Sequence, residues 1–140
     1  MKIANRMETL SPSVTMAITA LGRELKAQGK DILSFSAGEP DFDTPQIVKD
    51  AAIKAINDGQ TKYTAVEGII ATKQAIINKL KKDHGLEYKL DGIVISNGAK
   101  HSLFNLFQVL IEEGDEVIIP APYWVTYPEQ VKFSDGVPVF

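Results

Sequence analysis

The residues best suited to chemistry stand in two short stretches, each of which follows an apolar, strand-like run. The first, residues 96–100 (SNGAK), joins such a run to a segment with helical periodicity. Backbone N–H groups at the start of a helix attract anions, and the small Gly98 and Ala99 would let a phosphate approach closely. Short turns with one glycine are also plain connections in many proteins, and neither the dinucleotide-binding nor the P-loop glycine pattern is present. Alone, the stretch therefore favours an ordinary connection over a phosphate site.

The second stretch, residues 121–124 (APYW), holds the only tryptophan of the chain. It follows the next strand-like run, so both stretches can lie at the edge of a parallel sheet where such sheets bind ligands. An aromatic ring there can stack on a flat ligand, although core packing explains Trp124 equally well. A phosphate-binding turn beside a stacking ring suggests a flat, phosphorylated cofactor.

Regular segments must position these two stretches. Apolar residues at helical spacing predict helices over 11–29, 44–59, 69–85, 97–114 and 123–133. Ser11 and Thr44 are the expected N-caps, with prolines in the first helical positions after them and glycines at the ends. In the third helix, Ile69, Ile76, Ile77 and Leu80 are expected to face inward and the lysines outward.

Four short runs read as strands, over 31–36, 92–96, 115–120 and 136–140. From residue 92 onward the order is strand, helix, strand, helix, strand. That order is typical of an α/β fold with a mostly parallel sheet and crossover helices.

The composition limits which binding partners and which cellular location are expected. The 140 residues suffice for one sizeable core, and the net charge of −3 comes without a basic cluster, which argues against nucleic acid. No apolar run is long enough to cross a membrane, no secretory signal is visible, and there are no cysteines. His84 and His101 lie far apart, so no metal site is expected. A cytoplasmic location follows as the expectation.

Four motifs carry a resemblance to a known family: SAGEPDFDTP, TKYTAVEG, SNGAKHSLFNLFQVL and GDEVIIPAPYWVTYPE. They occur in the order and spacing of class I aminotransferases, which use pyridoxal 5′-phosphate. The chain resembles the N-terminal part of the bacterial aspartate aminotransferase branch over nearly its whole length. The resemblance implies the start of the aminotransferase fold (fold type I). Residues 1–45 would be the N-terminal arm and a small-domain segment, and residues 46–140 the first, truncated part of the cofactor-binding large domain.

The resemblance also implies roles for residues of the two stretches. Trp124 matches the ring that stacks on the pyridoxal ring, which also places it at the substrate. Gly98, Ala99 and Lys100 match the turn that lines the cofactor phosphate, with the Lys100 side chain in solvent and only its backbone N–H in contact.

Three further residues are assigned a role only by the resemblance. Gly38 matches the residue whose backbone meets the substrate carboxylate. Tyr63 matches a tyrosine that crosses a homodimer interface to the phosphate held by the other subunit. Ser11 stands where we associate a basic residue with prephenate transamination, which argues against that activity here.

The activity implied is transfer of an amino group between an amino acid and a 2-oxo acid, of the aspartate:2-oxoglutarate type. The family's Schiff-base lysine, its carboxylate on the pyridine nitrogen and its substrate-binding arginine match no residue present. The chain is therefore expected to be a fragment without catalytic residues, inactive alone. Two alternatives stay open: an aromatic, alanine or kynurenine aminotransferase, and a non-catalytic fragment that binds phosphate compounds or a partner.

Overall fold

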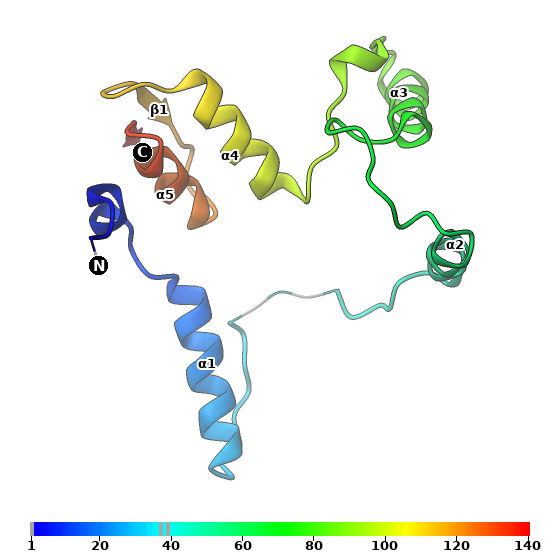
Figure 1. Cartoon of the computed structure of the whole chain (residues 1–140). Helices are drawn as coiled ribbons and strands as arrows, with labels where there is room; N and C mark the ends of the chain where they lie inside the picture. The colour runs from blue at the N-terminus through cyan, green and yellow to red at the C-terminus, as the bar shows by residue number, and fades with distance from the viewer. Residues whose placement is uncertain (1, 37, 39) are drawn as a thin grey trace. The chain divides into compact units, whose positions relative to one another are not determined.

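The computed structural model describes residues 2–36, 38 and 40–140, so Ala37 and Glu39 of the AGEP stretch lie outside the described residues (Figure 1). The chain divides into two compact units, which are described separately. Unit 1 consists of Met1–Glu39 and Leu103–Phe140, and unit 2 of Pro40–Ser102. The predicted division at residue 45 concerns the domains of a longer protein and stays a prediction.

Helices dominate both units. The α-helices are α1 Val14–Ala27, α2 Gln46–Asn57, α3 Ile70–His84, α4 Ala99–Leu110 and α5 Thr126–Phe133, the 3-10 helices are η1 Asn5–Thr9 and η2 Leu90–Gly92, and the strands are β1 Glu116–Ile118 and β2 Val137–Val139. The five predicted α-helices are thus confirmed, with shorter bounds.

The core of unit 1 is a parallel β-α-β element. β1 and β2 pair with Glu116 opposite Val137, and α5 connects them (Figure 1). Val131 of α5 is fully buried, and Ile119 at the end of β1 is buried as well. The ring of Phe133 also packs on Phe104 of α4, with 5.6 Å between centroids. The predicted parallel pairing with a crossover helix is confirmed for these two strands.

Two predicted strands are wrong, because residues 31–36 and 92–96 form no strand in the structure. A strand exists only where a ladder of backbone hydrogen bonds joins it to a neighbour. The backbone N–H of Ile95 instead donates to the carbonyl of Glu67 (2.9 Å), in the loop before α3. Gly68 permits this approach, since a Cβ there would lie 2.3 Å from Ile95 Cγ1.

Both predicted N-caps are also wrong. Ser13, not Ser11, caps α1, and its Oγ accepts from the backbone N–H of Met16 (3.3 Å). At α2 the residue before the helix is Pro45, whose ψ of 140° is extended, and no side chain caps the helix. Thr44 precedes this N-cap position, and its N–H donates to the carboxylate of Asp43 (2.8 Å).

In unit 2, the residues expected to face inward are not all buried, and one residue expected to face outward is. On α3, Ile76, Ile77 and Leu80 are half-buried as predicted, but Ile69 is exposed. Lys73 is buried, contrary to the prediction that the lysines face outward, and its Nζ lies 3.9 Å from the carboxylate of Glu67. A buried ammonium needs such a partner.

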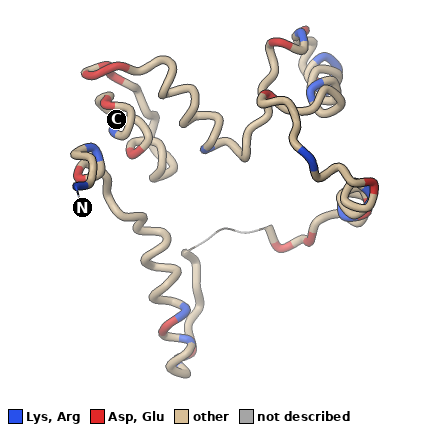
Figure 2. Tube along the Cα trace, viewed as in Figure 1, with Lys and Arg blue, Asp and Glu red and all other residues tan. Residues whose placement is uncertain are grey.

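The charged residues of α1 lie only toward its C-terminal end, α2 carries both signs, and α3 carries mostly lysines, whereas α4 carries a charge only at its start (Figure 2). Across residues 2–36, 38 and 40–140, no helix is long and apolar enough to span a membrane. The same residues contain no group of three or more metal-ligating side chains.

Candidate functional site

The turn before α4 has the geometry of a helix start in which glycine is required. Gly98 has a φ of +85°, a region that side chains with a Cβ rarely adopt. Its N–H donates to the carbonyl of Ser96 (2.8 Å), and its carbonyl accepts the N–H of His101 (3.1 Å), so the chain folds directly into α4 at Ala99. This is the turn that the sequence predicts at residues 96–100.

The space beside Gly98 is open. A Cβ built there would meet no atom within 4 Å, and Asn97, Ala99 and Lys100 are exposed. The first N–H groups of any α-helix lack acceptors within the helix, and they carry the positive end of its dipole. The open space and the helix dipole therefore both favour the approach of an anion to this turn.

The charge around the turn favours an anion as well. Between Gly92 and Ile111 the chain has no acidic residue and one lysine, Lys100, in the first turn of α4 (Figure 2). An anion at this helix start would thus meet no carboxylate from α4.

His101 makes a further contact in the turn that sequence reasoning missed. Its Nδ1 accepts the backbone N–H of Asn97 at 3.1 Å. His101 is the third residue of α4, a position from which a side chain can reach back to the turn before a helix. That spacing from Gly98 is the sequence signal that would have indicated the contact.

Trp124 lies in unit 1, beyond the end of β1 and just before α5. Its side chain is half-exposed, with 48% of its surface accessible, and its carbonyl accepts the N–H of Tyr127 (3.0 Å). The preceding Tyr123 stacks on Phe140, with 4.9 Å between centroids and 20° between the rings. Trp124 is therefore not a core side chain within the described residues.

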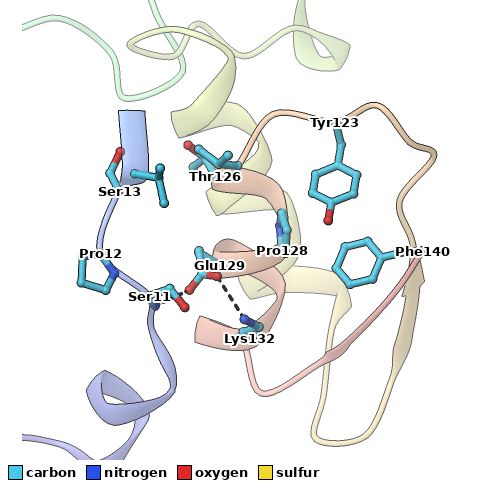
Figure 3. A pocket seen from close by; sticks show the side chains of 11 residues that line it. Ser11, Pro12, Ser13, Tyr123, Thr126, Pro128, Glu129, Lys132 and Phe140 are labelled. Atoms are coloured by element: carbon cyan, nitrogen blue, oxygen red, sulfur yellow. Dashed lines mark hydrogen bonds and ion pairs between the residues drawn. The ribbon is translucent and has the colours of Figure 1, made fainter. Parts of the chain in front are cut away.

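A cavity of about 420 Å³ opens in unit 1 between the segment before α1 and α5 (Figure 3). Its lining consists of Ser11, Pro12, Ser13, Val14, Tyr123, Val125, Thr126, Pro128, Glu129, Lys132 and Phe140. Figure 3 shows Glu129 between Ser11 and Lys132. The carboxylate accepts the backbone N–H of Ser11 at 2.8 Å and pairs with Lys132 at 3.0 Å.

Glu129 is the second functional contact that the sequence did not predict. Partial burial raises the pKa of its carboxyl, but the hydrogen bond from Ser11 and the nearby Lys132 together outweigh this effect, and the net pKa is lowered. The ionised form of Glu129 thus ties the segment before α1 to α5. A contact between residues so far apart leaves no signal in local sequence.

The remaining predicted site residues are exposed. Tyr63 is fully exposed and, with Thr61 and Lys62, lines a shallow hollow of about 300 Å³ in unit 2. Gly38 is exposed in unit 1. Chain connectivity brings Gly98, Ala99 and Lys100 together in one turn, and the predicted roles of Tyr63 and Gly38 stay predictions.

Comparison with known proteins decides the family. The model of the family "Aminotransferase class I and II" matches residues 30–140. The chain belongs to this aminotransferase family. An aspartate aminotransferase of Bacillus sp. (strain YM-2) is 59% identical over 99% of the chain and 35% of its own length. An aspartate/prephenate aminotransferase of Nitrosomonas europaea is 54% identical over all of the chain and 35% of its own length.

Solved aminotransferase structures share the fold. The aspartate aminotransferase of Thermus thermophilus with maleate superposes with a TM-score of 0.93 at 43% identity, over 99% of this chain and 36% of that one. The predicted fold, the start of the fold type I aminotransferase architecture, is thereby confirmed. The chain spans about a third of the length of the aminotransferases it matches.

Proposed function

We propose that the whole protein is an aspartate-type aminotransferase that uses pyridoxal 5′-phosphate. It would move an amino group between an amino acid and a 2-oxo acid. The observation that carries the proposal is the family match over residues 30–140. The open glycine turn before α4 and the half-exposed Trp124 support it. Because the chain spans about a third of its relatives, the activity belongs to the whole protein.

The residues present suit the cofactor's phosphate and ring. Gly98 and Ala99, with the backbone N–H of Lys100, would hold the phosphate at the start of α4, and Trp124 would stack on the ring. The bound cofactor supplies an electron sink for the amino acid's α-carbon. The part of this chain is to fix that ring in place, while the backbone of Gly38 orients the substrate carboxylate.

The proposed substrates are aspartate and 2-oxoglutarate. Relatives called aspartate aminotransferases, 54–59% identical to the chain, support this choice. Prephenate is a second candidate acceptor, because a relative called an aspartate/prephenate aminotransferase is also 54% identical. The serine at position 11 argues against it. Aromatic, alanine or kynurenine substrates, and a non-catalytic binding role, remain the alternatives.

We also propose that the whole protein is a cytoplasmic homodimer in which Tyr63 reaches the cofactor of the other subunit. The full exposure of Tyr63 supports the proposal, since a phenol that crosses an interface must be free of its own unit's core. Its O–H would donate to a phosphate oxygen, and hydrogen bonds to charged groups are the stronger kind.

The test is turnover by the purified whole protein. With pyridoxal phosphate we expect conversion of aspartate and 2-oxoglutarate to oxaloacetate and glutamate, faster than with alanine, kynurenine or an aromatic amino acid as donor. Prephenate in place of 2-oxoglutarate tests the second acceptor. Cofactor binding without turnover of any donor would instead favour the non-catalytic alternative.

The 140 residues alone should not transaminate, because none of their lysines matches the family's cofactor-binding lysine. Incubation with pyridoxal phosphate, reduction with borohydride and mass spectrometry should reveal scattered surface adducts. A single stoichiometric lysine adduct together with turnover would contradict this expectation.

A further inference from the structure

His101 stands in the turn that the proposed function assigns to the cofactor phosphate, yet it matches none of the motif positions with a phosphate role. Its Nδ1 accepts the backbone N–H of Asn97 at 3.1 Å. An imidazole nitrogen that accepts a hydrogen bond does so through a lone pair and not through a negative charge. His101 thus provides an acceptor to the turn without providing a negative charge.

The geometry resembles the capping box that begins many helices, with two differences: the acceptor is not a carboxylate, and the donor N–H belongs to Asn97 rather than to the residue directly before the helix. In a capping box, the side chain of the third helical residue accepts a backbone N–H from the turn before the helix, and that side chain is usually glutamate or glutamine. His101 occupies the third position of α4 and accepts from the residue before Gly98. A glutamate there would make the same bond but would place a carboxylate beside the anion site.

The bond also completes the hydrogen bonding of the turn. The N–H of Asn97 goes to His101, and the N–H of Gly98 goes to the carbonyl of Ser96 (2.8 Å). The Gly98 carbonyl in turn accepts from His101 N–H (3.1 Å) and from Ser102 N–H (3.3 Å). His101 therefore contacts the turn twice, at the Asn97 N–H and at the Gly98 carbonyl, and the space beside Gly98 is open.

We propose that His101 is a positioning residue. Through its bond to the Asn97 N–H, the imidazole holds the turn before α4 in the shape that receives the cofactor phosphate, and it adds no carboxylate to that helix start. The inference rests on the proposed function, because it names how one residue prepares that same site. It does not require His101 to touch the phosphate.

The test uses three variants of the whole apoprotein, titrated with pyridoxal phosphate and, separately, with pyridoxal, which lacks the phosphate. His101→Leu removes the acceptor, and it should weaken binding of pyridoxal phosphate about three- to ten-fold, the effect of one hydrogen bond. His101→Gln restores a neutral acceptor and should bind within about two-fold of wild type. His101→Glu restores the bond with a negative charge and should weaken binding about ten-fold or more, because the charge opposes the helix dipole's attraction for phosphate.

Two readouts separate positioning from general stability. Affinity for pyridoxal should stay unchanged in all three variants, and thermal unfolding of the apo form should show His101→Glu to be as stable as wild type. His84→Leu and His84→Glu, at the exposed end of α3, are matched controls that should bind both compounds as wild type does.

The outcomes distinguish the inference from the function on which it rests. If the wild-type protein binds pyridoxal phosphate but all three variants bind it equally well, or lose pyridoxal to the same extent, the positioning role is overturned. It is overturned as well if His101→Gln binds as weakly as His101→Leu. If the wild-type protein does not bind pyridoxal phosphate, the proposed function fails and the inference fails with it.

Discussion

For Trp124, a packing role and a ligand-binding role predict different effects of substitution. Its ring is half-exposed, so Trp124→Leu should cost little stability in the apoprotein. If the ring stacks on the cofactor, the lost stacking of about 0.5–1.5 kcal/mol should weaken pyridoxal phosphate binding by the whole protein about two- to ten-fold. Fluorescence titration measures this affinity. Tyr123→Phe, which keeps the neighbouring ring on Phe140, is the control, and equal affinity with a lower melting temperature would assign Trp124 to packing.

At the scale of single residues, the sequence predicted where a residue lies along a turn or helix better than it predicted which residue it contacts. The glycine turn at Gly98 was recognisable because a small residue between a β-branched run and a helix is a local pattern. The use of Ser13 rather than Ser11 as the cap was not, because both serines precede the same apolar run. Ser11 is held instead by Glu129, at a separation of 118 residues.

At the scale of elements, Gly136 fixes how closely the turn before β2 approaches its neighbours. A Cβ at Gly136 would lie 2.7 Å from Ile111 Cγ2 and 3.2 Å from the carbonyl oxygen of Asp115. Gly136→Ala should therefore destabilise the whole protein by about 1–3 kcal/mol, the usual cost of overpacking. Denaturant unfolding measures the change.

Gly22, inside α1, is the matched control for Gly136. A Cβ at Gly22 would meet only Ser34 Oγ, at 3.8 Å, so the position has room. Gly22→Ala should stabilise the protein by about 0.5–1 kcal/mol, because alanine favours the helix. Equal effects of the two substitutions would show that contact around Gly136 is not tight.

The contact between α5 and the segment before α1 should respond to pH. The pKa of Glu129 is lowered below its ordinary value of 4.5, because the bond from Ser11 and the charge of Lys132 outweigh the raising effect of burial. A carboxyl with a lowered pKa stabilises the fold above its ordinary pKa, and this contribution disappears as pH falls through the lowered value. Wild type should thus exceed Glu129→Gln in melting temperature at pH 7, and the difference should close below pH 4.5.

The comparison with Glu129→Gln isolates this one group. The pKa of Asp43 is also lowered, by the hydrogen bond from Lys49 and then by the N–H of Thr44, so Asp43 titrates in the same range. Because Asp43 is present in both proteins, its contribution cancels in the difference. A difference that does not vary with pH would show that the charge of Glu129 is unimportant to the contact.

Elements were predictable where their evidence is local. The sequence pattern predicted the five α-helices that the described residues form, and the parallel pair β1–β2 followed from the order of segments around α5. The runs at 31–36 and 92–96 have the composition of strands, but a strand also needs a neighbour, and composition does not specify one. Ile95 bonds to the loop at Glu67 instead.

At the scale of the whole molecule, substitution of Tyr63 tests whether this residue acts across the proposed dimer interface. Combine one subunit that carries Tyr63→Phe with a second subunit that lacks its cofactor-binding lysine, using two affinity tags. One site of the heterodimer then carries both lesions, and the other keeps its lysine and receives an intact Tyr63 from its neighbour. That site should bind pyridoxal phosphate with wild-type affinity. Affinity as weak as in the Tyr63→Phe homodimer would mean that Tyr63 acts within its own chain.

At the same scale, an apolar helix face does not specify the surface that covers it. Val48 and Ile56 fall on the predicted apolar stripe of α2, yet they are 52% and 64% exposed. Periodicity states that such a face is suited to burial, but it does not identify the surface that would cover it. The roles of Gly38 and Tyr63 likewise depend on groups beyond their own units, which is why they rested on family resemblance alone.

The hydrogen bond between Ser11 and Glu129 has a consequence for synthesis. Ser11 leaves the ribosome early, but its acceptor is added 118 residues later. At about 5–20 residues per second, the N-terminal segment waits roughly 6–24 s before its anchor exists. During that interval it is available to chaperones, proteases and modifying enzymes, and a ribosome that pauses before codon 129 lengthens the exposure. The timing of translation is therefore part of how this segment reaches its place.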